Sequence, residues 1–207
     1  MGRIDKILSV FSEMYPNAEC ELNYTNSLEL IVAVMLSAQT TDKSVNILTE
    51  NLFKKYTTVE DYANVNLEEL QNDLKRIGLY KNKAKNVINM AKLLIKNFDG
   101  KVPSSQVELE SLPGVGRKTA NVVLSVWYNI PRIAVDTHVD RVSKRLKLAY
   151  KNDTVYQVEE KLMRKIPKNK WSQTHHQMIF FGRYHCTSRK PHCENCKLKE
   201  LCRYPNI

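Results

Sequence analysis

A proline and two glycines interrupt an otherwise helical pattern near the middle of the chain, in the run Leu112-Pro113-Gly114-Val115-Gly116. Together with Leu109, the leucine and the valine of this run form an apolar stripe that would pack two helices at an angle. We expect both glycines to reach positive φ and to let another backbone approach closely. The run predicts a hairpin of two helices, the second beginning near Arg117 with N–H groups that suit a phosphate.

Apolar residues recur at helical spacing along most of the chain. Ser27 is expected to cap a helix that stays apolar through Leu36 and is therefore buried. Asn66 and Thr154 stand at capping positions of two further helices, and Gly78 is a natural stop. No segment has the two-residue alternation of a strand bounded by turns. The sequence therefore predicts an all-α fold with about ten helices.

The charge of the chain favours a nucleic-acid-binding hairpin over an ordinary helix–helix turn, which has the same pattern. The 207 residues carry a formal charge of +10 and are 43% hydrophobic, as expected for a globular protein with a polyanionic partner. The most apolar run, 30–36, is too short to cross a bilayer, and the N-terminus does not resemble a signal peptide. We expect a cytoplasmic, intracellular protein that is associated with DNA and has no membrane partner.

Lys118 and Asp136 are the candidate chemical groups. The positive end of a helix dipole, the neighbouring Arg117 and burial would each disfavour a charged amine on Lys118 and make it a nucleophile. The alternative is a surface lysine that contacts phosphate. Asp136 follows the apolar run 133–135 and can cap the next helix. A carboxylate close to Lys118 would oppose the helix dipole, and the sequence does not say which influence is larger.

Four of the five cysteines crowd the C-terminus with the spacing Cys186-x6-Cys193-x2-Cys196-x5-Cys202. A tight group of thiols in a reducing compartment is more often a metal site than a set of disulfides. Four thiolates suit either tetrahedral zinc or a [4Fe–4S] cluster. Spacing alone leaves that choice open.

Three segments together resemble the endonuclease III family of helix-hairpin-helix DNA glycosylases: residues 112–124, residues 133–142, and 182–186 with the three cysteines that follow. The similarity extends from about Leu22 through the cysteines. It implies a two-lobed fold, with a helical barrel domain at 21–131. Residues 1–20 and 132–207 would form a discontinuous domain that ends in an iron–sulfur loop, and a DNA groove would separate the lobes.

The resemblance also assigns roles. It implies that Lys118 is the nucleophile, that Asp136 is the catalytic carboxylate, and that the four cysteines hold a [4Fe–4S] cluster. Gln39 and Leu79 match positions that fill the gap left by an everted nucleotide. The alternatives are that Gln39 is only a polar residue at the C-terminal end of a helix and that Leu79 is a core leucine. His138 and Glu110 are candidates for pocket or proton-relay residues. The further predicted DNA contacts are Gly114, Gly116, Arg117, His138, Arg189 and Lys190.

The implied function is a bifunctional DNA glycosylase and AP lyase of base excision repair, acting as a monomer on duplex DNA. Its substrates would be damaged, oxidised pyrimidines and abasic sites. Two alternatives remain open. One is a monofunctional mismatch adenine glycosylase, which would carry a glutamate in the early buried helix, although residues 31–41 hold no carboxylate. The other is a non-enzymatic iron–sulfur DNA-binding module.

Overall fold

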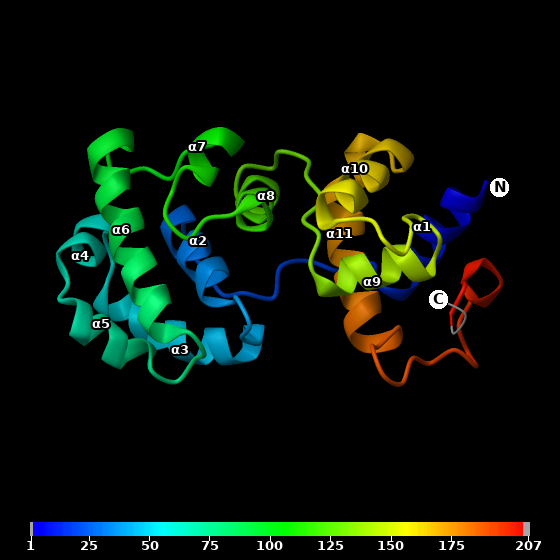
Figure 1. Ribbon diagram of the computed structural model, residues 1–207, viewed down its shortest axis with the longest axis horizontal. Coiled ribbons are helices and arrows are strands. Elements are labelled where there is room, and N and C mark those ends of the chain that lie inside the picture. Colours follow the sequence, from blue (N-terminus) through cyan, green and yellow to red (C-terminus); the bar gives the residue numbers. More distant parts are fainter. Residues whose placement is uncertain (1, 205–207) are drawn as a thin grey trace. The chain divides into compact units, whose positions relative to one another are not determined.

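The computed structural model of the protein describes residues 2–204, and every regular element in that range is a helix. The predicted all-α class is therefore confirmed. Contacts divide the chain into two compact units (Figure 1). We call Glu21–Asn129 the hairpin unit, and Met1–Cys20 together with Ile130–Ile207 the cysteine unit.

The hairpin unit is built around α2 (Ser27–Leu36), a helix whose residues from Leu30 to Leu36 are all buried. It packs against α3 (Asp42–Lys55), α6 (Tyr80–Phe98) and α8 (Arg117–Val126). A helix covered on several sides is apolar all round, as its sequence predicts. The expected cap is wrong by one residue, because the Asn26 side chain accepts the N–H of Glu29 while Ser27 is already helical.

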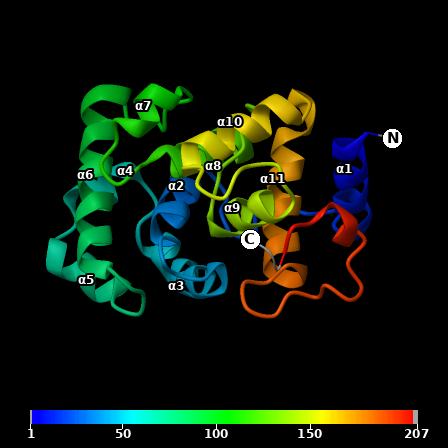
Figure 2. The ribbon, with the colours of Figure 1, turned by 45° about the vertical axis from the view of Figure 1, so that its right-hand side comes forward.

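Three shorter helices complete the hairpin unit. α4 (Val59–Asn64) and α5 (Leu67–Leu74) both lie along α6 (Figures 1 and 2). Asn66 caps α5, as predicted, by accepting the N–H of Glu68. α7 (Gln106–Glu110) packs against α8, and the proline–glycine run joins the two.

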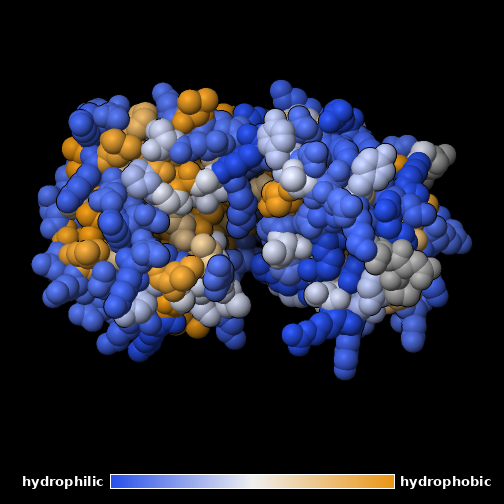
Figure 3. Space-filling model, viewed as in Figure 1, coloured by the Kyte–Doolittle hydropathy of each residue, from blue (hydrophilic) through white to orange (hydrophobic). Residues whose placement is uncertain are grey.

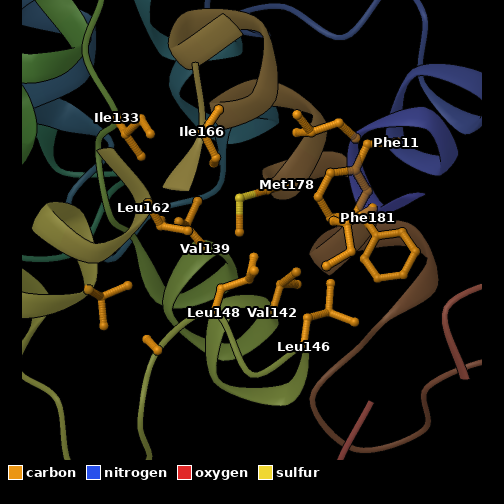
Figure 4. Packing of buried hydrophobic residues seen from close by; sticks show 14 of the residues in the cluster. Phe11, Ile133, Val139, Val142, Leu146, Leu148, Leu162, Ile166, Met178 and Phe181 are labelled. Carbon is orange, nitrogen blue, oxygen red and sulfur yellow. The ribbon is translucent and has the colours of Figure 1, made fainter. Parts of the chain in front are cut away.

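The cysteine unit combines α1 (Arg3–Met14), α9 (Thr137–Arg145), α10 (Val155–Lys165) and α11 (Trp171–Phe180). α11 continues into a π-helical turn, η2 (Phe181–His185), and two 3-10 turns are η1 (Lys168–Lys170) and η3 (Lys199–Leu201). The predicted Thr154–Gln157 capping box begins α10. Apolar side chains from α1, α9, α10 and α11 meet in one core with others from the segments that flank these helices, as Figure 4 shows.

The surface and the core divide as expected for a folded globular chain. Side chains such as Phe11, Val139, Leu162 and Met178 have no exposed surface, and the face drawn in Figure 3 is mostly hydrophilic. Across residues 2–204, no helix combines the length and the hydropathy that a membrane crossing needs.

Candidate active site and cysteine cavity

The turn between α7 and α8 depends on Gly114. Its φ is +79°, and a Cβ atom there would lie 2.8 Å from Cβ of Asn86 on α6. Both facts exclude a larger residue, since L-residues rarely adopt this conformation and the space is occupied. Gly116 differs from our expectation, because its φ is −93° and no atom lies within 4 Å of its Cβ position. The absence of a side chain at Gly116 leaves open space beside the N-terminus of α8.

Lys118 occupies the first turn of α8, next to the proline–glycine run. The residue is exposed, so the expectation that burial acts on its amine is wrong. The N-cap of this helix is Gly116, which has no side chain and therefore makes no side-chain capping bond. The first N–H groups of a helix lack intrahelical acceptors. The helix therefore presents N–H donors and an amine together at one exposed end.

Asp136 is the N-cap of α9 in the cysteine unit. Its Oδ1 accepts the N–H groups of His138 at 2.9 Å and Val139 at 2.8 Å. Before it, residues 133–135 are buried, as their sequence predicts. The capping role is therefore confirmed, and both hydrogen bonds go to one oxygen. Within the described part of the chain Oδ2 accepts no hydrogen bond, so one carboxylate oxygen is left for other chemistry.

His138 lies in the same first turn and is half-buried. Burial lowers the pKa of His138, and the nearby carboxylate of Asp136 partly opposes that change. Nη2 of Arg141 lies 3.2 Å from its Nδ1 and donates at 2.7 Å to the carbonyl oxygen of Gly182. Nε of Arg141 donates to the carbonyl oxygen of Cys186 at 3.1 Å. A chain of polar contacts thus runs from the cap of α9 to the first cysteine.

Gln39 and Leu79 share an unusual backbone conformation. Their φ values are +54° and +59°, in the left-handed region that ordinary residues avoid. Both are exposed, and Leu79 leaves 52% of its surface open to solvent. The alternative that Leu79 is a core leucine is therefore wrong. Leu79 is also the N-cap of α6, and its side chain makes no capping hydrogen bond.

The four C-terminal cysteines line one cavity of about 630 Å³ in the cysteine unit, together with apolar side chains including Leu146 and Phe181. All four are unpaired as disulfides and partly buried. Burial raises the pKa of the Cys186 and Cys196 thiols. In residues 2–204, no three His, Cys, Asp or Glu side chains converge tightly enough to hold one metal ion. The sulfurs border a space instead of converging on a point.

Arg145 anchors this loop from α9. It is only 6% exposed, and its Nη1 donates to Sγ of Cys186 at 3.2 Å and to the carbonyl oxygen of Thr187 at 2.8 Å. Leu198, between the last two cysteines, is fully buried in the core. Arg189 and Lys190 are exposed on the loop, and Lys190 also borders the cavity. The loop therefore presents cations while its base is fixed to the unit.

Sequence reasoning missed the residues that support the site, above all Asn86, Arg145 and Lys83. Lys83 is 6% exposed. A signal for Lys83 was present, since it stands four residues before Val87 on the apolar stripe of its helix. Of the two predicted chemical groups, Lys118 belongs to the hairpin unit and Asp136 belongs to the cysteine unit.

Comparison with known proteins identifies the relatives of this chain. Residues 32–168 match the model of the HhH-GPD superfamily, described as base excision DNA repair proteins. Endonuclease III of Bacillus subtilis (strain 168) is 56% identical over 98% of this chain and 93% of the relative. Endonuclease III of Escherichia coli (strain K12) is 43% identical over 96% of this chain and 94% of its own length.

Solved structures of endonuclease III are also similar to this chain. A trapped covalent intermediate of endonuclease III with DNA, an estranged-adenine complex, superposes with a TM-score of 0.95 at 53% identity, covering 98% of this chain and 96% of that one. A non-covalent endonuclease III–DNA complex superposes with the same TM-score at 52% identity and the same coverage.

Proposed function

This chain belongs to the endonuclease III family and is a base excision repair DNA glycosylase with AP-lyase activity, and we propose that Lys118 is its nucleophile and Asp136 its catalytic carboxylate. It binds DNA, as its relatives in the solved complexes do. We further propose that its substrates are oxidised pyrimidines and abasic sites in duplex DNA.

One observation carries the assignment of Lys118: an exposed amine stands in the first turn of α8, beside a glycine turn without a side-chain cap. An amine attacks through its nitrogen lone pair, and a lysine that is open to solvent at the start of a helix is available for such an attack. The trapped covalent intermediate of a relative at 53% identity supports chemistry that passes through a bond to DNA.

The proposed reaction begins when the neutral amine of Lys118 attacks C1′ of the damaged nucleotide. The bond from C1′ to the base breaks, and the base leaves with the electron pair and takes up a proton. Opening of the sugar ring gives a protonated Schiff base, which makes the C2′ proton acidic. Loss of that proton expels the 3′ phosphate by β-elimination, and water then releases the lysine. At a preformed abasic site the same amine adds to the open aldehyde.

Asp136 would supply negative charge where the sugar becomes positive as the base departs. The capping bonds to Oδ1 support this role, because they fix the carboxylate in one orientation and leave Oδ2 available. A carboxylate that is already held in place does not have to reorganise during the reaction. His138, in the same turn, is proposed to contact the DNA beside it.

Gln39 and Leu79 are proposed to enter the duplex when a nucleotide is everted. A base inside a duplex is out of reach, and unstacking it costs a few kcal/mol that an inserted side chain partly offsets. Their exposed tips and left-handed backbones support this proposal. Each such conformation costs about 1–3 kcal/mol, and conformations of this kind cluster at functional sites.

A [4Fe–4S] cluster is proposed to occupy the cavity that the four cysteines line, each holding one iron. The residues fit the group: four thiols border one space of about 630 Å³, and Arg145 donates to a sulfur from outside it. The bound cluster would supply structural cross-linking of the loop. Arg189 and Lys190 would then face phosphates, and Gly114, Gly116 and Arg117 would contact the backbone from the hairpin.

The proposed enzyme works as a monomer. We propose that it acts on DNA inside the cell. Cleavage of duplexes containing one oxidised pyrimidine, one abasic site or one A·G mismatch tests the substrate class directly. We expect cleavage of the first two, and covalent trapping on DNA by borohydride.

The same assay distinguishes the other functions. Adenine release from the mismatch without trapping would identify a monofunctional glycosylase. Salt-sensitive DNA binding without any cleavage would identify a binding module. Trapping that persists in Lys118→Ala would contradict the assigned nucleophile.

A further inference from the structure

Lys83 is a buried amine that the proposed chemistry does not use. It lies in the first turn of α6 and is only 6% exposed. Burial lowers the pKa of its amine. No carboxylate within residues 2–204 pairs with it, although burying an unpaired ammonium is costly. An apolar side chain would fill this position at less cost, so the amine is expected to have a specific task.

The contacts of Lys83 connect the two exposed tips of the hairpin unit. Its Nζ donates to Oγ1 of Thr40 at 3.0 Å, and Thr40 directly follows Gln39 in the chain. Its backbone N–H donates to the carbonyl oxygen of Leu79 at 3.0 Å, the first helical hydrogen bond of α6. One residue therefore joins the turn after α2 to the turn before α6.

The two turns have few other means of keeping their shape. Leu79 and Gln39 are both held at positive φ, which is unfavourable for residues that have a Cβ. Such conformations persist only where the surroundings hold them. Within the turn at Gln39, the N–H of Thr40 donates to the carbonyl oxygen of Ser37 at 3.1 Å, and the Thr40 hydroxyl donates to the carbonyl oxygen of Ala38 at 3.4 Å. The Lys83 side chain adds a contact that ties this turn to a long helix.

We propose that Lys83 is a positioning residue, which fixes the spacing of the Gln39 and Leu79 tips through its bond to Thr40 and so assists eversion of a paired base. The inference rests on the proposed function, in which these two tips enter the duplex. Lys83 itself touches no substrate. Its loss should slow reactions that require a base to leave the stack, and spare those in which the base is already absent.

The test compares single-turnover rates on two duplexes of the same sequence, one with a paired oxidised pyrimidine and one with a preformed abasic site. Lys83→Met keeps the length of the side chain and removes the amine, and Thr40→Val removes the hydroxyl acceptor. Each should slow base excision about tenfold, the factor expected for one lost hydrogen bond, and change cleavage of the abasic site less than about twofold.

The controls are matched to these variants. Lys92→Met removes an exposed charge from the same helix, and Thr40→Ser keeps the hydroxyl. Both should behave like the wild type on the two duplexes. Thr40→Val removes the bond from Lys83 together with the bond from the Thr40 hydroxyl to Ala38, so adding Lys83→Met should slow the reaction no further than Thr40→Val alone. If Lys83→Met does not fold, the Thr40 pair still decides the matter.

The outcomes separate this inference from the proposed function. Equal slowing on both duplexes, or no slowing in Thr40→Val relative to Thr40→Ser, would overturn the role of Lys83. If the wild type does not form a borohydride-trapped adduct, the proposed function itself fails. The ratio of the rate of base excision to the rate of abasic-site cleavage also tests Leu79. If Leu79→Ala and the wild type have the same ratio, the Leu79 side chain does not assist eversion, and the proposed role of Lys83 is contradicted as well.

Discussion

Two helix N-termini carry the proposed chemistry, and they are built in opposite ways. α9 begins with a side-chain cap, since Oδ1 of Asp136 accepts two backbone N–H groups. α8 begins with Gly116 and has no side-chain cap among the described residues, while Lys118 stands exposed in its first turn. The first end is neutralised by its own carboxylate, and the second keeps its N–H donors and positive potential for something else.

The difference shows how one local element serves two purposes. A capped N-terminus holds a carboxylate in a defined place, and the helix gains stability from it. An uncapped N-terminus gives up that stability and keeps its N–H donors available to bind an anion. Substitutions at Asp136 and at the glycines before α8 should therefore separate effects on folding from effects on catalysis and DNA binding.

The largest effect is expected from Lys118. Lys118→Ala should lower strand cleavage by at least about a thousandfold, because it removes the group that is proposed to form the covalent bond. Lys118→Arg should be just as inactive, yet bind DNA about as tightly as the wild type, because a guanidinium still contacts phosphate but is not a nucleophile. Cleavage rates and fluorescence anisotropy measure the two properties. An active Lys118→Arg variant would reduce this residue to a phosphate contact.

Substitutions of Asp136 should separate its proposed catalytic role from its capping role. Asn caps helices as well as Asp does but carries no charge. Asp136→Asn should therefore slow base release about a hundredfold or more while leaving thermal stability nearly unchanged. Asp136→Ala should show the same slowing and also lose about 1 kcal/mol of unfolding free energy. If the asparagine variant is fully active, the carboxylate is only a cap.

The glycines at the uncapped end should respond unequally. Gly114→Ala places a Cβ 2.8 Å from Asn86 at positive φ, and should lower the free energy of unfolding by about 3 kcal/mol. Gly116→Ala meets open space at a φ of −93° and should fold normally, while weakening DNA binding by crowding the N–H groups. Urea unfolding and binding measurements check both. Equal destabilisation by the two substitutions would contradict this account of the turn.

Acid should affect the two units differently, because all five histidines lie in the cysteine unit. Burial lowers the pKa of His176 from 6.5 to about 4. The unfolded chain therefore binds a proton that the folded chain refuses, so this stability is complete above pH 6.5 and is lost as the pH falls toward 4. The loss should reach about 2–3 kcal/mol at pH 4.5.

His176→Gln supplies the control for that prediction, since it removes the titrating group. Urea unfolding of both proteins at pH 7 and pH 4.5 measures the difference. The gap between them should appear only at the lower pH. The same pH dependence in both proteins would mean that other groups carry the acid sensitivity.

Much of this molecule is readable from local sequence. The Thr154–Gln157 capping box, the cap at Asp136 and the conformation of Gly114 each depend on a few neighbouring residues. Properties that depend on distant neighbours are not readable in this way. The exposure of Lys118 and the burial of Lys83 depend on which helices pack beside them. The open space at Gly116 likewise depends on how distant segments pack.

The site was predictable to different degrees for the same reason. The spacing of the four cysteines leaves zinc and an iron–sulfur cluster equally open, and the fold adds the cavity that they border. Left-handed backbone at Leu79 has no local signal, because a glycine precedes it and a leucine rarely adopts that conformation. Motifs therefore predict the chemical groups, whereas packing decides their surroundings.

The attachment point of the DNA tests the central claim most directly. The protein would be reduced with borohydride on a duplex that contains one abasic site, digested, and mapped by mass spectrometry. We predict a deoxyribose remnant on the peptide that carries Lys118, and on no other lysine. A remnant on the N-terminal amine or on a different lysine would contradict the assignment of the α8 amine as the nucleophile.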